Sequence, residues 1–102
     1  MNIPSSLRIV GREYDVVKLD YENQVGGVDF DTCTIGIKSK QQKLLEADTL
    51  LHESLHVIDE IFQLDLSERQ VYCVVGGIMA LLRDNENLLP YINDALVSPR
   101  KL

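Results

Sequence analysis

The chain has 102 residues, of which 45 % are hydrophobic and 25 % are charged, and its formal net charge is −6. This length and composition are typical of one soluble globular domain with a modest core. The acidic balance argues against nucleic-acid binding, because phosphates would be repelled. No apolar run is long enough to cross a bilayer and the N-terminus lacks the pattern of a signal peptide, so we expect a cytoplasmic protein without a membrane partner.

Taken in chain order, the first segments predict β-structure. Residues 7–10 and 13–19 are rich in Ile, Val, Tyr and Leu, several of which favour strands. Gly11-Arg12 between them is a Gly-X pair suited to a two-residue type II′ turn. We therefore expect an antiparallel hairpin near the start of the chain.

Residues 21–38 continue the β-rich part. Residues 21–31 contain many Gly, acidic and amide residues and predict a loop, with 28–30 as the stretch that could form a short strand. Residues 32–38 alternate between apolar residues and polar or glycine residues, which predicts a half-buried strand. The apolar members of this alternation are Cys33, Ile35 and Ile37.

Residues 41–61 predict one uninterrupted helix, because apolar residues recur at helical spacing and the span contains no Gly or Pro. At about 100° per residue, five apolar side chains fall within a narrow stripe, which we expect to face the core. These residues are Leu44, Leu51, Leu55, Ile58 and Phe62.

The same helix contains an H-E-x-x-H motif at residues 52–56, which holds the two histidines of the chain. His52 and His56 lie one turn apart beside the predicted stripe, and two neutral imidazoles so placed can bind one side of a tetrahedral zinc ion. Glu53 lies about 100° round from His52, which suits a carboxylate that takes a proton from a water molecule on the metal. The alternative is an amphipathic helix whose histidines lie on its solvated edge.

Residues 67–83 predict a second helix, because Ser67 and Gln70 fit the capping-box pattern S-x-x-Q. Its apolar residues form a second stripe, which consists of Val71, Val74, Val75, Ile78 and Leu82. Gly76 and Gly77 each lower the stability of this helix by about 1 kcal/mol relative to alanine. We infer either close contact there with another backbone, that of the histidine helix, or a local kink.

Residues 88–96 predict a short third helix, and residues 98–102 form a tail. The sequence contains no internal repeat or linker, so we expect residues 1–102 to form a single domain. Residues 1–40 are β-rich and residues 41–102 are helical, which predicts the α+β fold class.

A catalytic zinc site usually has three protein ligands and one open position, so a third ligand is needed. Asp59 lies on the histidine face but about 7.5 Å beyond the metal along the axis, which suits a group that orients an imidazole, or a helix-end charge. Glu68 falls close to the apolar stripe of the second helix, where a neighbouring cation would offset the cost of burying a carboxylate. Alternatively, Glu68 only complements the helix dipole.

A ligand role for Glu68 sets a geometric condition. In a tight antiparallel pair of helices, Glu68 would lie about 10 Å from the metal along the axis. The first helix must therefore end soon after Ile58, or the second helix must cross it steeply. Tyr72 lies one turn after Glu68, where it could stabilise an oxyanion or pack in the core.

The H-E-x-x-H motif followed by Leu66-Ser67-Glu68 resembles the zincin metallopeptidases, and their gluzincin branch in particular. More narrowly, residues 50–85 are similar to small phage and mobile-element proteins of the ImmA/IrrE-like metallopeptidase type, and the first forty residues loosely so. The resemblance implies a minimal zincin-like fold, with a small antiparallel sheet packed on the histidine helix and a following helix pair. It also implies that residues 32–38 form a sheet edge that pairs with an extended substrate; the alternative is an ordinary strand that covers the helix.

We therefore expect a zinc-dependent metalloendopeptidase, with Zn²⁺ bound by His52, His56 and Glu68. Glu53 would be the general base. The substrate would be a peptide or protein, and the resemblance suggests a regulatory protein such as a repressor. The alternative is a non-catalytic metal-binding or protein-interaction domain of the same fold, such as a phage-encoded regulator or inhibitor, because the chain is short and larger zincins wall the cleft with a second lobe.

Overall fold

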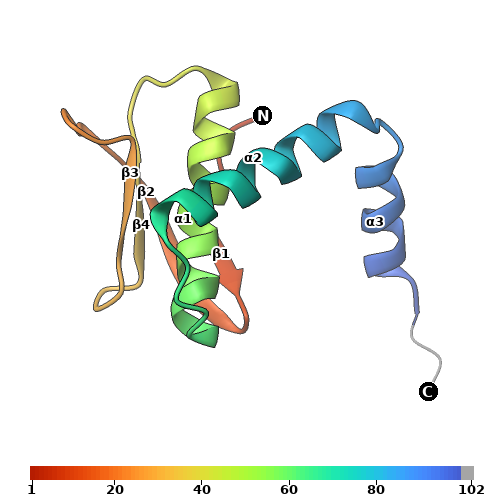
Figure 1. Cartoon of the computed structure of the whole chain (residues 1–102), viewed down its shortest axis with the longest axis horizontal. Coiled ribbons are helices and arrows are strands. Elements are labelled where there is room, and N and C mark those ends of the chain that lie inside the picture. The colour runs from red at the N-terminus through yellow and green to blue at the C-terminus, as the bar shows by residue number, and fades with distance from the viewer. Residues whose placement is uncertain (100–102) are drawn as a thin grey trace.

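The structure, a computed structural model, describes residues 1–99, and residues 100–102 of the expected tail lie outside the described part. Four strands are followed by three helices, which confirms the predicted α+β class (Figure 1). The strands are β1 (Ser6–Ile9), β2 (Arg12–Leu19), β3 (Gly26–Asp29) and β4 (Thr34–Lys38), and the helices are α1 (Lys43–Phe62), α2 (Glu68–Asp84) and α3 (Leu88–Val97). Within residues 1–99, no helix is both long and apolar enough to span a membrane.

The four strands form one mixed sheet in the order β1-β2-β4-β3. The pairs β1–β2 and β3–β4 are antiparallel, whereas β2 and β4 are parallel, with Val16 opposite Ile35. The expectation of an antiparallel sheet is therefore wrong for the central pair. The reason is the order of insertion: the chain leaves β2, returns along β3 and then places β4 between them, so β4 runs in the direction of β2.

The same strand order corrects the expected position of the sheet edge. β4, which covers most of residues 32–38, has a neighbour on each side, and the edge strand next to it is β3. β3 lies at Gly26–Asp29, within the segment predicted as a loop. The sequence did not predict the start of β3 because it consists of two adjacent glycines, and glycine has a low strand propensity and is typical of turns.

The first hairpin turns at Val10-Gly11 and not at the predicted Gly11-Arg12. Both turn residues have positive φ, 48° for Val10 and 79° for Gly11. Positive φ at both positions is the type I′ geometry, so the type II′ prediction is wrong. The resulting register buries Tyr14 and Val16, and a slip of one residue would turn them to the other face of the sheet.

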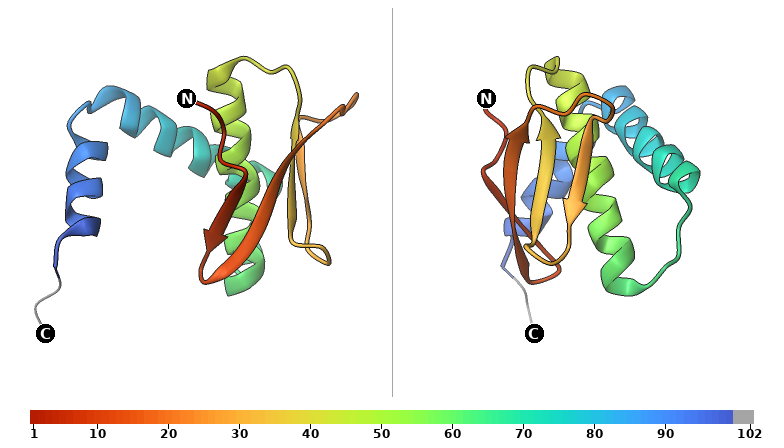
Figure 2. Two further views of the ribbon diagram at one scale, coloured as in Figure 1. Left: turned by 180° about the vertical axis from the view of Figure 1, so that it is seen from behind. Right: turned by 90° about the vertical axis from the view of Figure 1, so that its left-hand side faces the viewer.

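The hydrophobic core lies between α1 and one face of the sheet (Figure 2). The predicted alternation on β4 is confirmed for Ile35 and Ile37, because both side chains are fully buried. The core cluster consists of Ile9, Tyr14, Val16, Ile35, Ile37 and Val57. This cluster fixes α1 against the sheet and so sets the direction in which its histidines point.

The apolar stripe predicted for α1 faces the core only in part: Ile58 packs against the core cluster, whereas Leu44, at 74 % exposure, and Phe62 are exposed. The buried residues of α1 are Glu46, Thr49, Glu53 and Val57. Apolar residues occupy much of the circumference of this helix, so periodicity alone did not identify the buried face. Lys18 of β2 lies 3.3 Å from the carboxylate of Glu46, which offsets the cost of burying that charge.

α2 crosses α1 steeply, and its first half lies against α1 (Figure 1). Val71 and Val75 are buried there, whereas Ile78 of the same predicted stripe is exposed. Among residues 1–99, a methyl group added at Gly76 or Gly77 would meet no atom of another segment within 4 Å, so the predicted close contact is wrong. The second half of α2 and the whole of α3 extend away from the sheet (Figure 2).

Candidate metal centre

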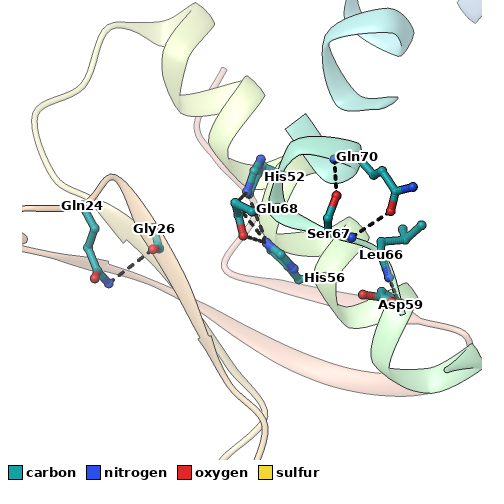
Figure 3. Close-up of polar contacts among 9 residues, drawn as sticks. All are labelled: Gln24, Gly26, His52, His56, Asp59, Leu66, Ser67, Glu68 and Gln70. Atoms are coloured by element: carbon teal, nitrogen blue, oxygen red, sulfur yellow. Dashed lines mark hydrogen bonds and ion pairs between the residues drawn. The ribbon is translucent and has the colours of Figure 1, made fainter. Parts of the chain in front are cut away.

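His52 and His56 lie side by side on α1, on the face that meets the start of α2 (Figure 3). Their Nε2 atoms are 3.2 Å apart, and their rings are T-shaped with centroids separated by 4.9 Å. Both side chains are partly exposed. The helical spacing therefore brings two ring nitrogens together at the boundary between the core and solvent, as the H-E-x-x-H motif predicted.

Glu68, the first residue of α2, completes this cluster from the second helix. Its carboxylate lies 2.5 Å from Nε2 of His52 and 3.1 Å from Nε2 of His56. Ligand atoms of all three residues lie within 4.8 Å of one another. The Glu68 side chain is 72 % exposed, so its predicted burial on the apolar stripe is wrong, and the cluster is open to solvent on this side.

Local hydrogen bonds fix the start of α2 and thereby the position of Glu68. The Ser67 hydroxyl accepts a hydrogen bond from the backbone N–H of Gln70 at 3.1 Å. The Gln70 side chain accepts one from the backbone N–H of Ser67 at 2.8 Å. These two bonds confirm the predicted capping box, and Glu68 follows the cap directly.

The connection between α1 and α2 depends on Asp59. Its carboxylate accepts a hydrogen bond from the backbone N–H of Leu66 at 3.3 Å. In residues 1–99 no hydrogen bond joins Asp59 to either imidazole, so the structure does not place it in the predicted role beside a histidine. It ties the connection to the last turns of α1, just before the cap of α2.

The crossing of the two helices decides whether Glu68 can reach the histidines. α1 continues to Phe62, so it does not end early. α2 instead crosses α1 steeply, and its first residue lies over His52 and His56 (Figure 3). The second of the two geometric conditions for a Glu68 ligand is therefore the one that the fold satisfies.

The donor set fits a metal ion, because two imidazoles and a carboxylate are ligands of catalytic zinc sites. Tetrahedral coordination with bonds of about 2.0–2.2 Å places ligand atoms about 3.3 Å apart. The separations of 3.2 Å between His52 and His56 and 3.1 Å between His56 and Glu68 agree with this value. The 2.5 Å between His52 and Glu68 is shorter and corresponds to a direct hydrogen bond. The cluster can thus close through hydrogen bonds or around a cation.

Glu53 is buried between α1 and the sheet, at 7 % exposure. Burial raises the pKa of its carboxyl, and the charges of His52 and His56 oppose that rise without cancelling it. Within the described residues, its side chain has no hydrogen-bond partner that would hold the charged form. A carboxyl of raised pKa beside the candidate ligands is suited to accept a proton.

Glu68 shows the opposite shift. Desolvation raises the pKa of its carboxyl, but hydrogen bonds and charge interactions with His52 and His56 outweigh this, so the pKa lies below its usual value. The environments of the two carboxyls are therefore different. Glu68 stays ionised and faces the imidazoles, whereas Glu53 takes up a proton more readily.

Tyr72 is 69 % exposed, which excludes the predicted alternative of packing in the core. It lies one turn after Glu68 on α2. Its role in stabilising an oxyanion stays a prediction.

Sequence analysis missed β3 as a neighbour of the site. Gly26 of this strand lies directly against Thr49 and Glu53 of α1. The side chain of Gln24 donates a hydrogen bond to the Gly26 carbonyl at 3.3 Å, on the strand beside the cluster (Figure 3). The signal in the sequence was the Gly26-Gly27 pair, which is equally typical of a turn.

Comparisons with protein-family models, with curated proteins and with solved structures each returned no match to this chain. The resemblance to zincin metallopeptidases therefore depends on the H-E-x-x-H motif and the following acidic residue, and it stays a prediction. The geometry of the cluster is the observation that points to a function.

Proposed function

We propose that this chain is a zinc-dependent metallopeptidase, with His52, His56 and Glu68 as metal ligands and Glu53 as general base. The observation that carries this proposal is the convergence of three ligand atoms within 4.8 Å from two different helices. Histidines one turn apart meet through local geometry. Glu68 follows His56 by 12 residues, on another helix, and reaches the same point through tertiary structure.

The roles of the two acids follow from their environments. A zinc ion held by this cluster would polarise the carbonyl of a peptide bond and make a water molecule more acidic. Glu53 would accept a proton from the attacking water and pass it to the leaving amine, and its buried carboxyl of raised pKa suits both steps. Glu68 is unsuited to carry the proton because its pKa is lowered.

The free edge of the sheet supports a peptide or protein as the substrate. Lys38 donates its backbone N–H to Val25 at 2.8 Å, and Gly26 pairs with Ile37 at the next position of the ladder. Because hydrogen-bonded positions alternate in an antiparallel pair, the N–H and C=O of Gly26 point to the open edge. An extended peptide that takes the place of the Gln24 side chain at the Gly26 carbonyl can add to such an edge as a further strand, and here it would lie beside Glu53.

The first test is metal content. Purified wild-type protein is expected to carry about one zinc ion per chain, as measured by inductively coupled plasma mass spectrometry. An anomalous-scattering map at the zinc edge should place that ion between His52, His56 and Glu68. His52→Ala and His56→Ala are expected to lose it. A wild type without a stoichiometric divalent metal would refute the proposal.

Catalysis is tested separately with Glu53→Gln. This variant is expected to keep its metal and to lose hydrolysis of a peptide library, because an amide cannot accept the proton. Hydrolysis at the wild-type rate by Glu53→Gln would show that another group is the base.

A second candidate function is a non-catalytic metal-binding or protein-interaction domain, such as a phage-encoded regulator or inhibitor. The exposed apolar side chains of α2 and α3 favour it, because large apolar patches mark contact sites with other proteins. They include Ile78, Leu81, Leu89, Tyr91, Leu96 and Val97. A wild type that binds zinc but hydrolyses no peptide would support this function over the first.

A further inference from the structure

Gly26 of β3 packs directly against α1. A methyl group at this position would lie 2.7 Å from Cγ2 of Thr49, and 3.0 Å and 3.1 Å from Oε2 and Cγ of Glu53. Non-bonded carbon atoms are optimally separated by about 3.5–4.0 Å, so a side chain fits here only if a neighbouring group moves. The backbone of Gly26 does not have positive φ. Glycine is therefore required here for space and not for conformational freedom.

The neighbouring Gly27 faces the other side of the sheet. A methyl group there would meet Nε2 of Gln24 at 3.2 Å and the hydroxyl of Tyr21 at 3.4 Å. Both atoms are at the far ends of flexible side chains, which can move aside. The requirement for glycine is thus confined to the side of the strand that touches Glu53.

The surroundings leave the Glu53 side chain as the part that moves when residue 26 becomes larger. β3 cannot retreat easily, because the positions on either side of Gly26 are tied to β4: Val25 accepts a hydrogen bond from Lys38, and Gly27 pairs with Gly36. Thr49 is held by a hydrogen bond from its hydroxyl to the carbonyl of Leu45 at 2.8 Å. The Glu53 carboxylate has no such bond within residues 1–99 and ends a longer side chain.

We propose that Gly26 is a positioning residue, which keeps the Glu53 carboxylate in its place beside the candidate metal ligands. It acts by leaving space that any side chain would take from that carboxylate. The consequence for catalysis rests on the proposed metallopeptidase function, whereas the effect on the position of Glu53 does not.

The experiment compares Gly26→Ala with Gly27→Ala, a change of the same size on the next residue of the same strand. Both substitutions are made in the wild type and in a Thr49→Ser background. This background removes the methyl group nearest to residue 26 and leaves the two contacts with Glu53 in place. It therefore keeps the comparison usable if Gly26→Ala alone does not fold because of Thr49.

Crystal structures of the variants give the first readout. In Gly26→Ala the Glu53 carboxylate is expected to move by about 0.5–1 Å, the distance that restores ordinary contacts. In Gly27→Ala it should keep its wild-type position. A carboxylate in the same place in both variants would overturn the inference, whether or not the protein is an enzyme.

Peptide hydrolysis gives the second readout. Gly26→Ala is expected to lower kcat about tenfold to a hundredfold, because misplacing a catalytic group by about 1 Å has an effect of that size. Its KM and zinc content should stay close to wild type, and Gly27→Ala should keep kcat. Equal kcat in the two variants would overturn the catalytic part of the inference. If the wild type hydrolyses no peptide, the proposed function fails, and the crystal structures still decide where Glu53 lies.

Discussion

The chain divides into a body, residues 1–75, and an arm, residues 76–99, which differ in how they are packed. In the part of the chain that the structure describes, every buried residue lies in the body, between Ile9 and Val75. The arm comprises the second half of α2 and all of α3. α3 has no buried residue, although most of its ten residues are apolar. Figure 2 shows the arm extending from the body without covering the sheet.

The candidate metal centre belongs to the body. His52 and His56 lie on a helix that the core holds against the sheet, and Glu68 lies in the first turn of α2, just before the buried Val71 and Val75. The site therefore depends on the packing of the body, and the arm contributes neither ligands nor buried surface to it. The buried core and the candidate metal ligands therefore lie in the same 75 residues, and the arm is the part of the molecule that can contact other molecules.

Removal of the zinc ion proposed for the cluster is the change with the largest expected effect, and it acts on the body. A ligand at a hundred times its dissociation constant stabilises the native state by about 2.7 kcal/mol. Since 1 kcal/mol corresponds to about 4–8 °C in a domain of this size, a chelator should lower Tm by about 10–20 °C. His56→Ala should melt at the lower temperature with or without the chelator. Calorimetry measures the Tm of the wild type and of His56→Ala. A wild-type Tm that is the same with and without the chelator would contradict the role given to the cluster.

Val57→Ala tests the core beneath the site. Val57 is fully buried, so the lost methyl groups and the cavity should lower the free energy of unfolding by about 2–3 kcal/mol. Val97→Ala makes the same change at 74 % exposure in the arm, and it should alter that free energy by less than about 0.5 kcal/mol. Urea unfolding measures both variants. Similar losses would show that the arm is packed as tightly as the body.

Ser67→Ala has a smaller expected effect, at the junction of the two regions. Loss of the helix cap should lower the free energy of unfolding by about 1 kcal/mol. It should also weaken zinc binding severalfold, because Glu68 follows the cap. Ser98→Ala at the end of α3 is the control, and it should change neither quantity. Zinc affinity, measured by competition with a coloured chelator, separates the outcomes: unaltered affinity in Ser67→Ala would mean that the cap does not position Glu68.

Deletion of α3 has the smallest expected effect and sharpens the comparison most. A chain that ends at Asn85 should keep its zinc content, and its Tm should fall by less than about 3 °C, because the deletion removes no buried residue. Metal analysis and calorimetry test this directly. A lost metal or a large fall in Tm would show that the arm is packed against another surface in solution.

The sheet shows which of its features could be predicted from the sequence and which could not. The alternation on β4 identified the buried Ile35 and Ile37, because the two-residue period of a strand is a local property. The parallel pairing of β2 with β4 and the position of β3 at the edge depend on which strands meet. No pattern within one strand records its neighbours.

For the candidate site, the sequence was sufficient to predict the parts that are held by residues near one another in the chain. These are the histidine pair one turn apart and the capped start of α2, which follow from helical spacing and from short-range hydrogen bonds. Three features follow instead from contacts between distant segments: which face of α1 is buried, the steep crossing that brings Glu68 to the histidines, and the contact of Gly26 with Glu53. The physical reason is that apolar side chains on much of α1 allowed several faces to be buried, and the close packing of distant segments selected one of them.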